Sequence, residues 1–341
     1  MRYKYKNMKK IILFVAAALL GGAISSAKSV PSEGQKQTPV ESKGQKQPLL
    51  EPEGTYLFAE RDSLQLFMDI YGVPEGVPRN FDSGKEKPSI LFVFGGGFKD
   101  GSRDHPFYNR WFREMSSRGF KVISIDYRLG MKGRQTKGLI DQADAIRHSL
   151  DLAVEDLFSA TEFIISNAEE LGIDPYNLVL CGSSAGAMTV LTAEFEICNS
   201  HKRAAVLPKG FDYAGVMSFA GAILGYDGAI RYAREPAPTL LMHGTGDKIV
   251  NYKGIRLFKR NFCGSSNLAR IYSRKGWNYC IYRFKGKGHE ISTSMLTNIN
   301  ETVDFLQRNV SEKQKRVIDA TVEDPSVRSS GAKSRKELYS E

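Results

Sequence analysis

Two hydrophobic periods alternate along this chain from about residue 55 to residue 310, one typical of strands and one typical of helices. In the segment 64–71, apolar residues occupy every second position, which is the period of a strand with one buried face. Another apolar run, 55–60, comes before it, and a short polar turn separates the two. We expect these two runs to pair as an antiparallel hairpin at the edge of a sheet.

From Pro88 the pattern changes to short apolar runs separated by segments with helical spacing. Such runs are typical of strands buried on both faces of a mostly parallel sheet, with helices covering the two faces. The predicted strands are 90–94, 122–126, 177–181, 213–219, 239–243 and 280–284, and helices are expected over 107–118, within 140–171 and over 295–310. The predicted fold class is therefore α/β, and we expect the insertion 224–238 to roof a pocket as a small cap.

The N-terminal 27 residues have the pattern of a secretory signal peptide. Basic residues precede an apolar run over 11–20, and small residues follow it up to Ala27. Cleavage is expected near Ala27, so we expect a secreted or periplasmic protein. The apolar run is too short to favour a permanent membrane span.

The segments beside the predicted domain are polar. Residues 28–54 contain two near-copies of Gly-Gln-Lys-Gln and little apolar surface to bury, so we expect a disordered linker there. Residues 311–341 are charged and poor in large apolar side chains, and they are expected to form a disordered tail. The ordered domain is then expected to span 55–310.

Composition and charge narrow the class of protein. With 341 residues, of which 41% are hydrophobic, the chain can bury a large core. The formal charge is +10, but the basic residues crowd the two ends without forming a patterned patch, so nucleic acid is not an expected partner.

The cysteines are too few and too scattered for a disulfide scaffold or a zinc site. They are Cys181, Cys198, Cys263 and Cys280. An exported protein could join Cys263 to Cys280, and the sequence favours neither this disulfide nor two free thiols. Cys181, on a central predicted strand, is expected to be buried and unpaired.

The strongest chemical signal is Ser184 in the G-x-S-x-G sequence 182–186, placed between a predicted strand and a predicted helix. At such a corner the glycines leave room for the backbone and the serine hydroxyl is exposed. An ordinary Gly/Ser loop is the alternative. A serine hydroxyl becomes a nucleophile only when a base accepts its proton.

Two further residues, each located just after a later strand, could supply the base and the acid that Ser184 needs. His289 follows the last predicted strand, and Asp247 follows the strand 239–243, so both are expected at the same sheet edge as Ser184. A surface histidine and a helix-capping aspartate are the respective alternatives. His243, at the end of a strand, fits a packing and hydrogen-bonding role better than that of a base. The order Ser, Asp, His is the order expected of one particular fold.

Backbone donors for an oxyanion are available after the strand 90–94, where three glycines, 95–97, place no side chain in the way. The N–H of Ala185, at a helix N-terminus, is another such donor. A phosphate-binding turn is the alternative, but the spacing lacks the usual nucleotide-binding pattern.

Together these features resemble the α/β-hydrolase fold, and more closely the carboxylesterases and hormone-sensitive-lipase-like esterases. The resemblance covers about 55–310 and rests on the segments 94–97, 126–128, 172–175, 182–186, 243–247 and 288–289. Many relatives carry a histidine before the three glycines, where this chain has Phe94.

The resemblance implies a serine hydrolase that acts on carboxylic esters through an acyl-enzyme and uses no metal and no other cofactor. It implies the triad Ser184, His289 and Asp247, with Gly96, Gly97 and Ala185 as the oxyanion donors. The expected partner is a small-molecule or carbohydrate ester. The alternatives are a peptidase on the same fold and a binding protein that has lost activity.

Overall fold

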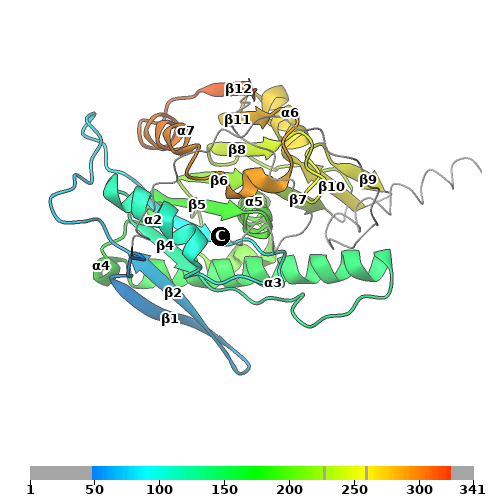
Figure 1. Ribbon diagram of the computed structural model, residues 1–341, viewed down its shortest axis with the longest axis horizontal. Helices are drawn as coiled ribbons and strands as arrows, with labels where there is room; N and C mark the ends of the chain where they lie inside the picture. Colours follow the sequence, from blue (N-terminus) through cyan, green and yellow to red (C-terminus); the bar gives the residue numbers. More distant parts are fainter. Residues whose placement is uncertain (1–47, 226–227, 258–259, 324–341) are drawn as a thin grey trace, which may run out of the picture.

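The computed structural model describes residues 48–225, 228–257 and 260–323, which form a nine-stranded sheet with helices on both faces (Figure 1). In spatial order the strands are β1 (Gly54–Arg61), β2 (Leu64–Tyr71), β4 (Val122–Ile125), β3 (Ser89–Val93), β5 (Leu178–Ser183), β6 (Gly215–Phe219), β8 (Thr239–Gly244), β11 (Tyr279–Phe284) and β12 (Val317–Val322). β2 pairs antiparallel with β1 and β4, and the other neighbours are parallel. The predicted α/β class and N-terminal hairpin are confirmed.

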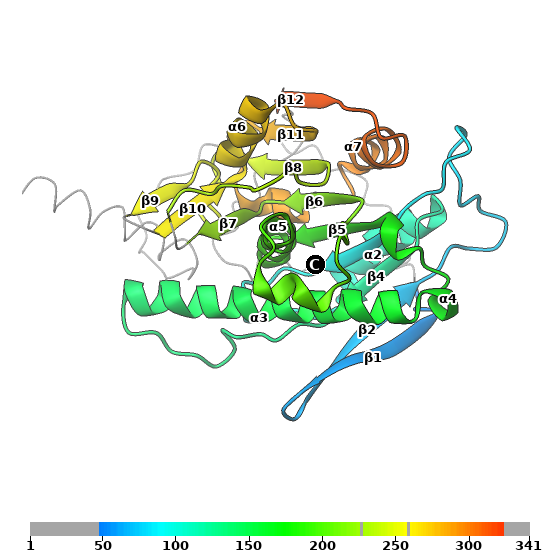
Figure 2. The same cartoon turned by 180° about the vertical axis from the view of Figure 1, so that it is seen from behind.

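Helices cover the sheet on two sides. They are α2 (Pro106–Ser117), α3 (Leu139–Ser166), α4 (Ala168–Leu171), α5 (Ala185–Cys198), α6 (Ser265–Lys275) and α7 (Ile299–Asp304), which continues as a π-helical segment, Phe305–Ser311. α3 and α5 pack on each other and stand in front of the sheet in Figure 2, whereas α2 lies behind it in that view. Over the described ranges, none of the helices combines the length and hydrophobicity needed to cross a lipid bilayer.

The central strands explain where a site can form. Every residue of β3, β5, β6 and β8 is buried, because helices cover both faces of these strands. These strands are parallel, so their carboxyl ends meet at one edge of the sheet. The loops after β3, β5, β8 and β11 therefore start side by side, and these loops hold the residues singled out by the sequence.

The C-terminal boundary predicted at residue 310 is wrong. β12, which lies within the predicted disordered tail, pairs with β11 in parallel along its whole length. Its half-buried residues Ile318, Ala320 and Val322 alternate with exposed ones, and Asp319 forms an ion pair with Arg283 of β11. This period-two pattern is that of an edge strand. The run is only six residues long and lies between the mostly charged residues 312–316 and Glu323. Residues 324–341 lie outside the described residues.

The predicted linker also ends earlier than expected. The backbone N–H of Leu50 donates to the side chain of Asn109, and the amide of Asn109 donates back to the carbonyl of Leu50. The Glu53 carboxylate lies 3.0 Å from Lys121 Nζ. Residues 48–54 thus pack against α2 and the start of β4. The predicted signal peptide and the rest of the linker lie outside the described residues.

A second, smaller sheet was not predicted. It contains β7 (Ala222–Gly225), β10 (Arg260–Gly264) and β9 (Ile255–Leu257), all antiparallel. In the adjoining insertion, the Tyr232 ring packs edge-on against Phe195 of α5, and its hydroxyl lies 2.8 Å from the Tyr272 hydroxyl of α6. This part of the insertion 224–238 therefore packs against two helices.

The possible disulfide between Cys263 and Cys280 is not formed. Both are buried free thiols in different sheets, Cys263 in β10 and Cys280 in β11, where the Cys280 Sγ lies 3.7 Å from Asn309 Oδ1. Burial raises the pKa of the Cys263 thiol to about 12 and that of Cys280 to about 11. Cys181 is buried and unpaired, as predicted.

Asp156 of α3 ties the helix to the residues after β4. Its side chain is fully buried, and its carboxylate accepts hydrogen bonds from the Nε of Arg128 at 3.0 Å and from the backbone N–H of Arg128 at 2.8 Å. Arg61 of β1 approaches the same carboxylate at 3.6 Å. One carboxylate thus contacts two arginines at the boundary between the hairpin, the sheet and α3.

We expect Asp156→Ala to lower the free energy of unfolding by about 1–3 kcal/mol, because the backbone N–H and the guanidinium of Arg128 lose a buried acceptor. Glu155→Ala is the matched control, since the Glu155 carboxylate also contacts Arg128 but its side chain is half exposed. It should cost no more than about 1 kcal/mol. Urea denaturation measures both values, and equal losses for the two variants would contradict this assignment.

Candidate active site

Ser184 occupies a tight corner between the end of β5 and the start of α5. Its backbone has φ 50° and ψ −110°, a strained conformation for a residue with a side chain. A Cβ on Gly182 would lie 2.4 Å from the Gly186 carbonyl carbon, and a Cβ on Gly186 would lie 1.9 Å from the Val93 carbonyl oxygen. The G-x-S-x-G spacing is therefore a steric requirement of this corner.

A continuous chain of hydrogen bonds starts at this serine. The Ser184 Oγ lies 2.8 Å from His289 Nε2, and the His289 Nδ1 lies 2.7 Å from Asp247 Oδ2. His289 begins a short 3₁₀ turn after β11, and Asp247 stands in the loop after β8. The three residues are 6%, 5% and 4% exposed. The structure thus brings together the three residues that the sequence singled out, at the carboxyl edge of the sheet.

The charge on Asp247 fixes where the protons lie. Burial alone would raise the pKa of Asp247, but His289 and His243 outweigh this effect and hold its pKa well below the usual range. The carboxylate is therefore ionised and can only accept hydrogen bonds. His289 must then donate from Nδ1, which leaves its Nε2 free to accept the Ser184 proton. This is the arrangement of a nucleophile, a base and an acid that orients the base.

Asp247 also holds its own loop. Its Oδ1 accepts hydrogen bonds from the backbone N–H groups of Ile249 at 2.8 Å and Val250 at 3.0 Å. The sequence offered two interpretations of this residue, an acid partner for the histidine or a capping aspartate. One oxygen binds His289 and the other binds the turn, so both interpretations describe part of what Asp247 does.

His243 contributes a second contact to the acid. It is fully buried, and its Nε2 lies 3.2 Å from Asp247 Oδ2 and 2.9 Å from the Val250 carbonyl oxygen. Both neighbours are acceptors, so Nε2 carries the hydrogen and Nδ1 accepts from the Ser265 hydroxyl at 2.8 Å. The hydrogen-bonding role predicted for His243 is confirmed. Its contact with Asp247 was missed, although the two residues are only four positions apart in the sequence.

Two tyrosines hold the glycine loop after β3. The Gly95 N–H donates to the Tyr108 hydroxyl at 3.0 Å, and the Tyr127 hydroxyl donates to the Phe94 carbonyl oxygen at 3.0 Å. The Phe94 ring stacks on Tyr127 with 4.4 Å between ring centroids. Where many relatives have a histidine, this chain therefore supports the loop through aromatic stacking and phenol hydrogen bonds. Sequence reasoning did not find the two tyrosines.

Of the three predicted oxyanion donors, two line the pocket beside Ser184 and one does not. Gly97 and Ala185 line the same pocket as Ser184. In the described part of the chain, neither of their N–H groups has a hydrogen-bond acceptor. Gly96 does not line this pocket, and its carbonyl accepts hydrogen bonds from the two backbone N–H groups that close the turn, at positions 99 and 100. The geometry therefore favours Gly97 and Ala185 as the donor pair.

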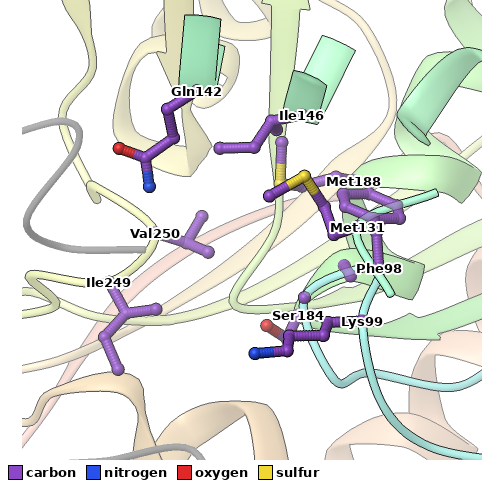
Figure 3. Close-up of a pocket in the computed structure, with 11 residues that line it drawn as sticks. Phe98, Lys99, Met131, Gln142, Ile146, Ser184, Met188, Ile249 and Val250 are labelled. Atoms are coloured by element: carbon purple, nitrogen blue, oxygen red, sulfur yellow. The ribbon is translucent and has the colours of Figure 1, made fainter. Parts of the chain in front are cut away.

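The pocket beside Ser184 is mostly apolar and open to solvent at its mouth (Figure 3). Its walls are Gly97, Phe98, Lys99, Met131, Gln142, Ile146, Ser184, Ala185, Met188, Ile249 and Val250. None of the described residues of 224–238 lines this pocket, so that part of the insertion does not form the expected roof over it. Within the described ranges, no three metal-binding side chains come close enough together to hold a metal ion.

Sequence comparison links this region to esterases. The family model BD-FAE matches residues 68–203, which is less than half of the chain. Gut esterase 1 of Caenorhabditis elegans is 32% identical over 103 residues, which are 30% of this chain and 17% of that protein. Fumonisin B1 esterase of Sphingopyxis macrogoltabida is 29% identical over 100 residues, 29% of this chain and 18% of that protein. The chain thus spans less than a fifth of the length of these two relatives.

Structural comparison covers more of the chain. The apo form of Thermogutta terrifontis esterase 2 superposes with a TM-score of 0.53 and 18% identity, over 76% of this chain and 97% of that chain. A second structure of this esterase, Est2-native, gives a TM-score of 0.55 and 19% identity, over 75% and 91% of the two chains. At this level of identity the likeness concerns the fold, and it confirms the α/β-hydrolase fold that the motifs predict.

We expect His243→Phe to slow the reaction of Ser184 with a fluorophosphonate by about tenfold or more, because the Asp247 carboxylate loses a charge-assisted hydrogen bond. Ser265→Ala is the control, since it removes the contacts of its hydroxyl with the other ring nitrogen and with the Gly221 carbonyl oxygen but keeps the contact between His243 and Asp247, and it should change the rate much less. Second-order labelling rates measure the effect, with circular dichroism as a check on folding. A folded His243→Phe protein that reacts as fast as the wild type would show that the contact has no role.

Proposed function

We propose that this chain, which has the α/β-hydrolase fold, is a serine hydrolase that cleaves carboxylic esters through an acyl-enzyme on Ser184. The observation that carries the proposal is the unbroken hydrogen-bond chain from the Ser184 Oγ through His289 to Asp247, at a corner that the two glycines keep tight. The match of the BD-FAE family model over residues 68–203, which include Ser184, supports it, as does the partial similarity to curated esterases.

In the proposed first step, the Ser184 Oγ attacks the ester carbonyl carbon while His289 Nε2 accepts its proton. The carbonyl oxygen becomes an oxyanion, and the N–H groups of Gly97 and Ala185 stabilise it, with Gly96 as the other candidate donor. His289 then donates the proton to the departing alkoxide. The ionised Asp247 stabilises the imidazolium during this step.

In the second step, water enters where the alcohol has left. His289 accepts a proton from this water, which attacks the acyl carbon, and the serine hydroxyl is regenerated when the acid leaves. Each proton moves through the same Nε2 atom, so the orientation of His289 by Asp247 serves both halves of the reaction. No metal or other cofactor has a part in this scheme.

A small-molecule or carbohydrate ester is the proposed substrate. The pocket adjoins Ser184 and is open at its mouth. Its apolar walls suit a short acyl group. The similarity to fumonisin B1 esterase and to gut esterase 1 supports ester cleavage as the reaction type of this chain. It does not define the substrate.

Export is also proposed. It rests on the sequence alone, in which basic residues, the apolar run 11–20 and small residues up to Ala27 follow one another. A secreted or periplasmic location is compatible with the four buried thiols, because burial protects them from oxidation.

We expect the purified protein to hydrolyse short-chain aryl esters at least ~100-fold more efficiently than matched anilides, a gap of about 2.7 kcal/mol in transition-state free energy. An amine is a poorer leaving group than an alkoxide and requires well-placed protonation. The measurement is kcat/KM for a p-nitrophenyl ester and the p-nitroanilide of the same acid. Comparable values would favour a peptidase.

Two variants accompany this measurement. Ser184→Ala should abolish nearly all hydrolysis of the ester, since the triad acts as a unit. Ser183→Ala is the matched control, because the Ser183 hydroxyl donates to the Ser292 carbonyl oxygen and does not line the pocket. Wild-type turnover by a folded Ser184→Ala protein would refute the proposal.

A further inference from the structure

Gln142 places an unsatisfied polar group in the wall of an apolar pocket. It stands in the first turn of α3, and only 4% of the residue is exposed. Among the described residues its Nε2 has no hydrogen-bond partner. A buried donor left without a partner costs about 1–3 kcal/mol. Such a group calls for a partner that the folded chain itself does not supply.

The neighbouring walls cannot supply this partner. The side chains of Met131, Ile146, Met188 and Val250 line the same pocket, and none of them offers a good hydrogen-bond acceptor. Figure 3 shows Gln142 and Ser184 on opposite sides of the pocket, with Val250 between them and Ile146, Met131 and Met188 along one side. A molecule that reaches from Ser184 to Gln142 therefore meets apolar surface first and a hydrogen-bond donor at the far side.

The positions of the proposed catalytic groups decide which part of an ester enters this pocket. The alcohol must leave beside the His289 Nε2, because it receives its proton there. His289 does not line the pocket, whereas Gly97 and Ala185, the proposed oxyanion donors, do. With the carbonyl oxygen beside these donors and the alcohol at His289, the remaining substituent of the carbonyl carbon, the acyl group, extends into the pocket.

We propose that Gln142 is a specificity residue that donates a hydrogen bond to an oxygen at the distal end of the acyl group. The favoured acyl groups then have an apolar middle and an acceptor oxygen, such as a ketone, ether or hydroxyl, several bonds from the ester carbonyl. This inference rests on the proposed esterase function and makes its substrate class more specific. Plain alkyl acyl groups of the same length leave the Gln142 amide unpaired and are poorer substrates.

The test compares p-nitrophenyl esters of straight-chain acids with esters of the same length that carry a ketone at carbon 4, 5 or 6. For wild-type protein, we expect one position of the ketone to raise kcat/KM about tenfold over the alkyl ester, the effect of about one hydrogen bond. Gln142→Leu, which keeps the size of the side chain, should remove this preference, so that kcat/KM becomes about equal for the ketone ester and the alkyl ester.

Ile146→Leu is the matched control, since it changes the apolar wall one helical turn further along α3 and keeps the amide. It should retain the preference for the ketone. A side chain with a purely structural role would change the rates for both esters together, whereas the proposal predicts a change in their ratio. The melting temperature of each variant shows whether it is folded.

Three outcomes would overturn the inference. If wild-type protein hydrolyses both series equally well at every ketone position, Gln142 does not bind the acyl oxygen, and the esterase proposal still stands. If the preference exists but survives in Gln142→Leu, another group provides it. If wild-type protein hydrolyses none of the esters, the proposed function fails, and the inference fails with it.

Discussion

The close approach of β5 to α5 at Ser184 is the constraint on which the rest of the site depends. The Gly186 backbone packs against the end of β3 so tightly that a single methyl group on this residue would overlap the Val93 carbonyl oxygen. The Ser184 N–H donates to the Phe219 carbonyl at 2.9 Å, which ties the corner to β6 as well. Neighbouring strands therefore hold the serine in a strained conformation, and the cost of this strain is met by packing across the centre of the sheet.

The other parts of the site extend this fixed point outward. β8 and β11 bring Asp247 and His289 to the same edge of the sheet. Hydrogen bonds of the glycine loop with Tyr108 and Tyr127 hold that loop in place. Asp247 lies between two histidines, of which His289 reaches Ser184 and His243 faces the protein interior. Burial alone would favour a neutral carboxyl group, so these contacts are what keeps Asp247 charged where His289 needs it.

Much of this arrangement could be predicted from the sequence. The period of the apolar runs predicted the sheet. The positions just after the strands pointed to Ser184, Asp247 and His289, because parallel strands share one carboxyl edge. The misses have physical reasons. β12 is a six-residue edge strand between charged segments, and β7, β9 and β10 are short antiparallel strands outside the main pattern. The contact of Tyr108 and the place of Gln142 in the pocket depend on packing between distant segments, which no local period reveals. The contact of His243 with Asp247 depends on how the loop after β8 turns back.

The most direct test of the central claim is to identify the residue that a fluorophosphonate labels. Peptide mapping by mass spectrometry after labelling should find the phosphonyl group on Ser184 in wild-type protein. His289→Ala should label far more slowly, because a serine hydroxyl reacts only when a base accepts its proton. Labelling of Ser183 or of a residue outside the pocket, or undiminished labelling of a folded His289→Ala protein, would contradict the account of Ser184 as a nucleophile activated by His289.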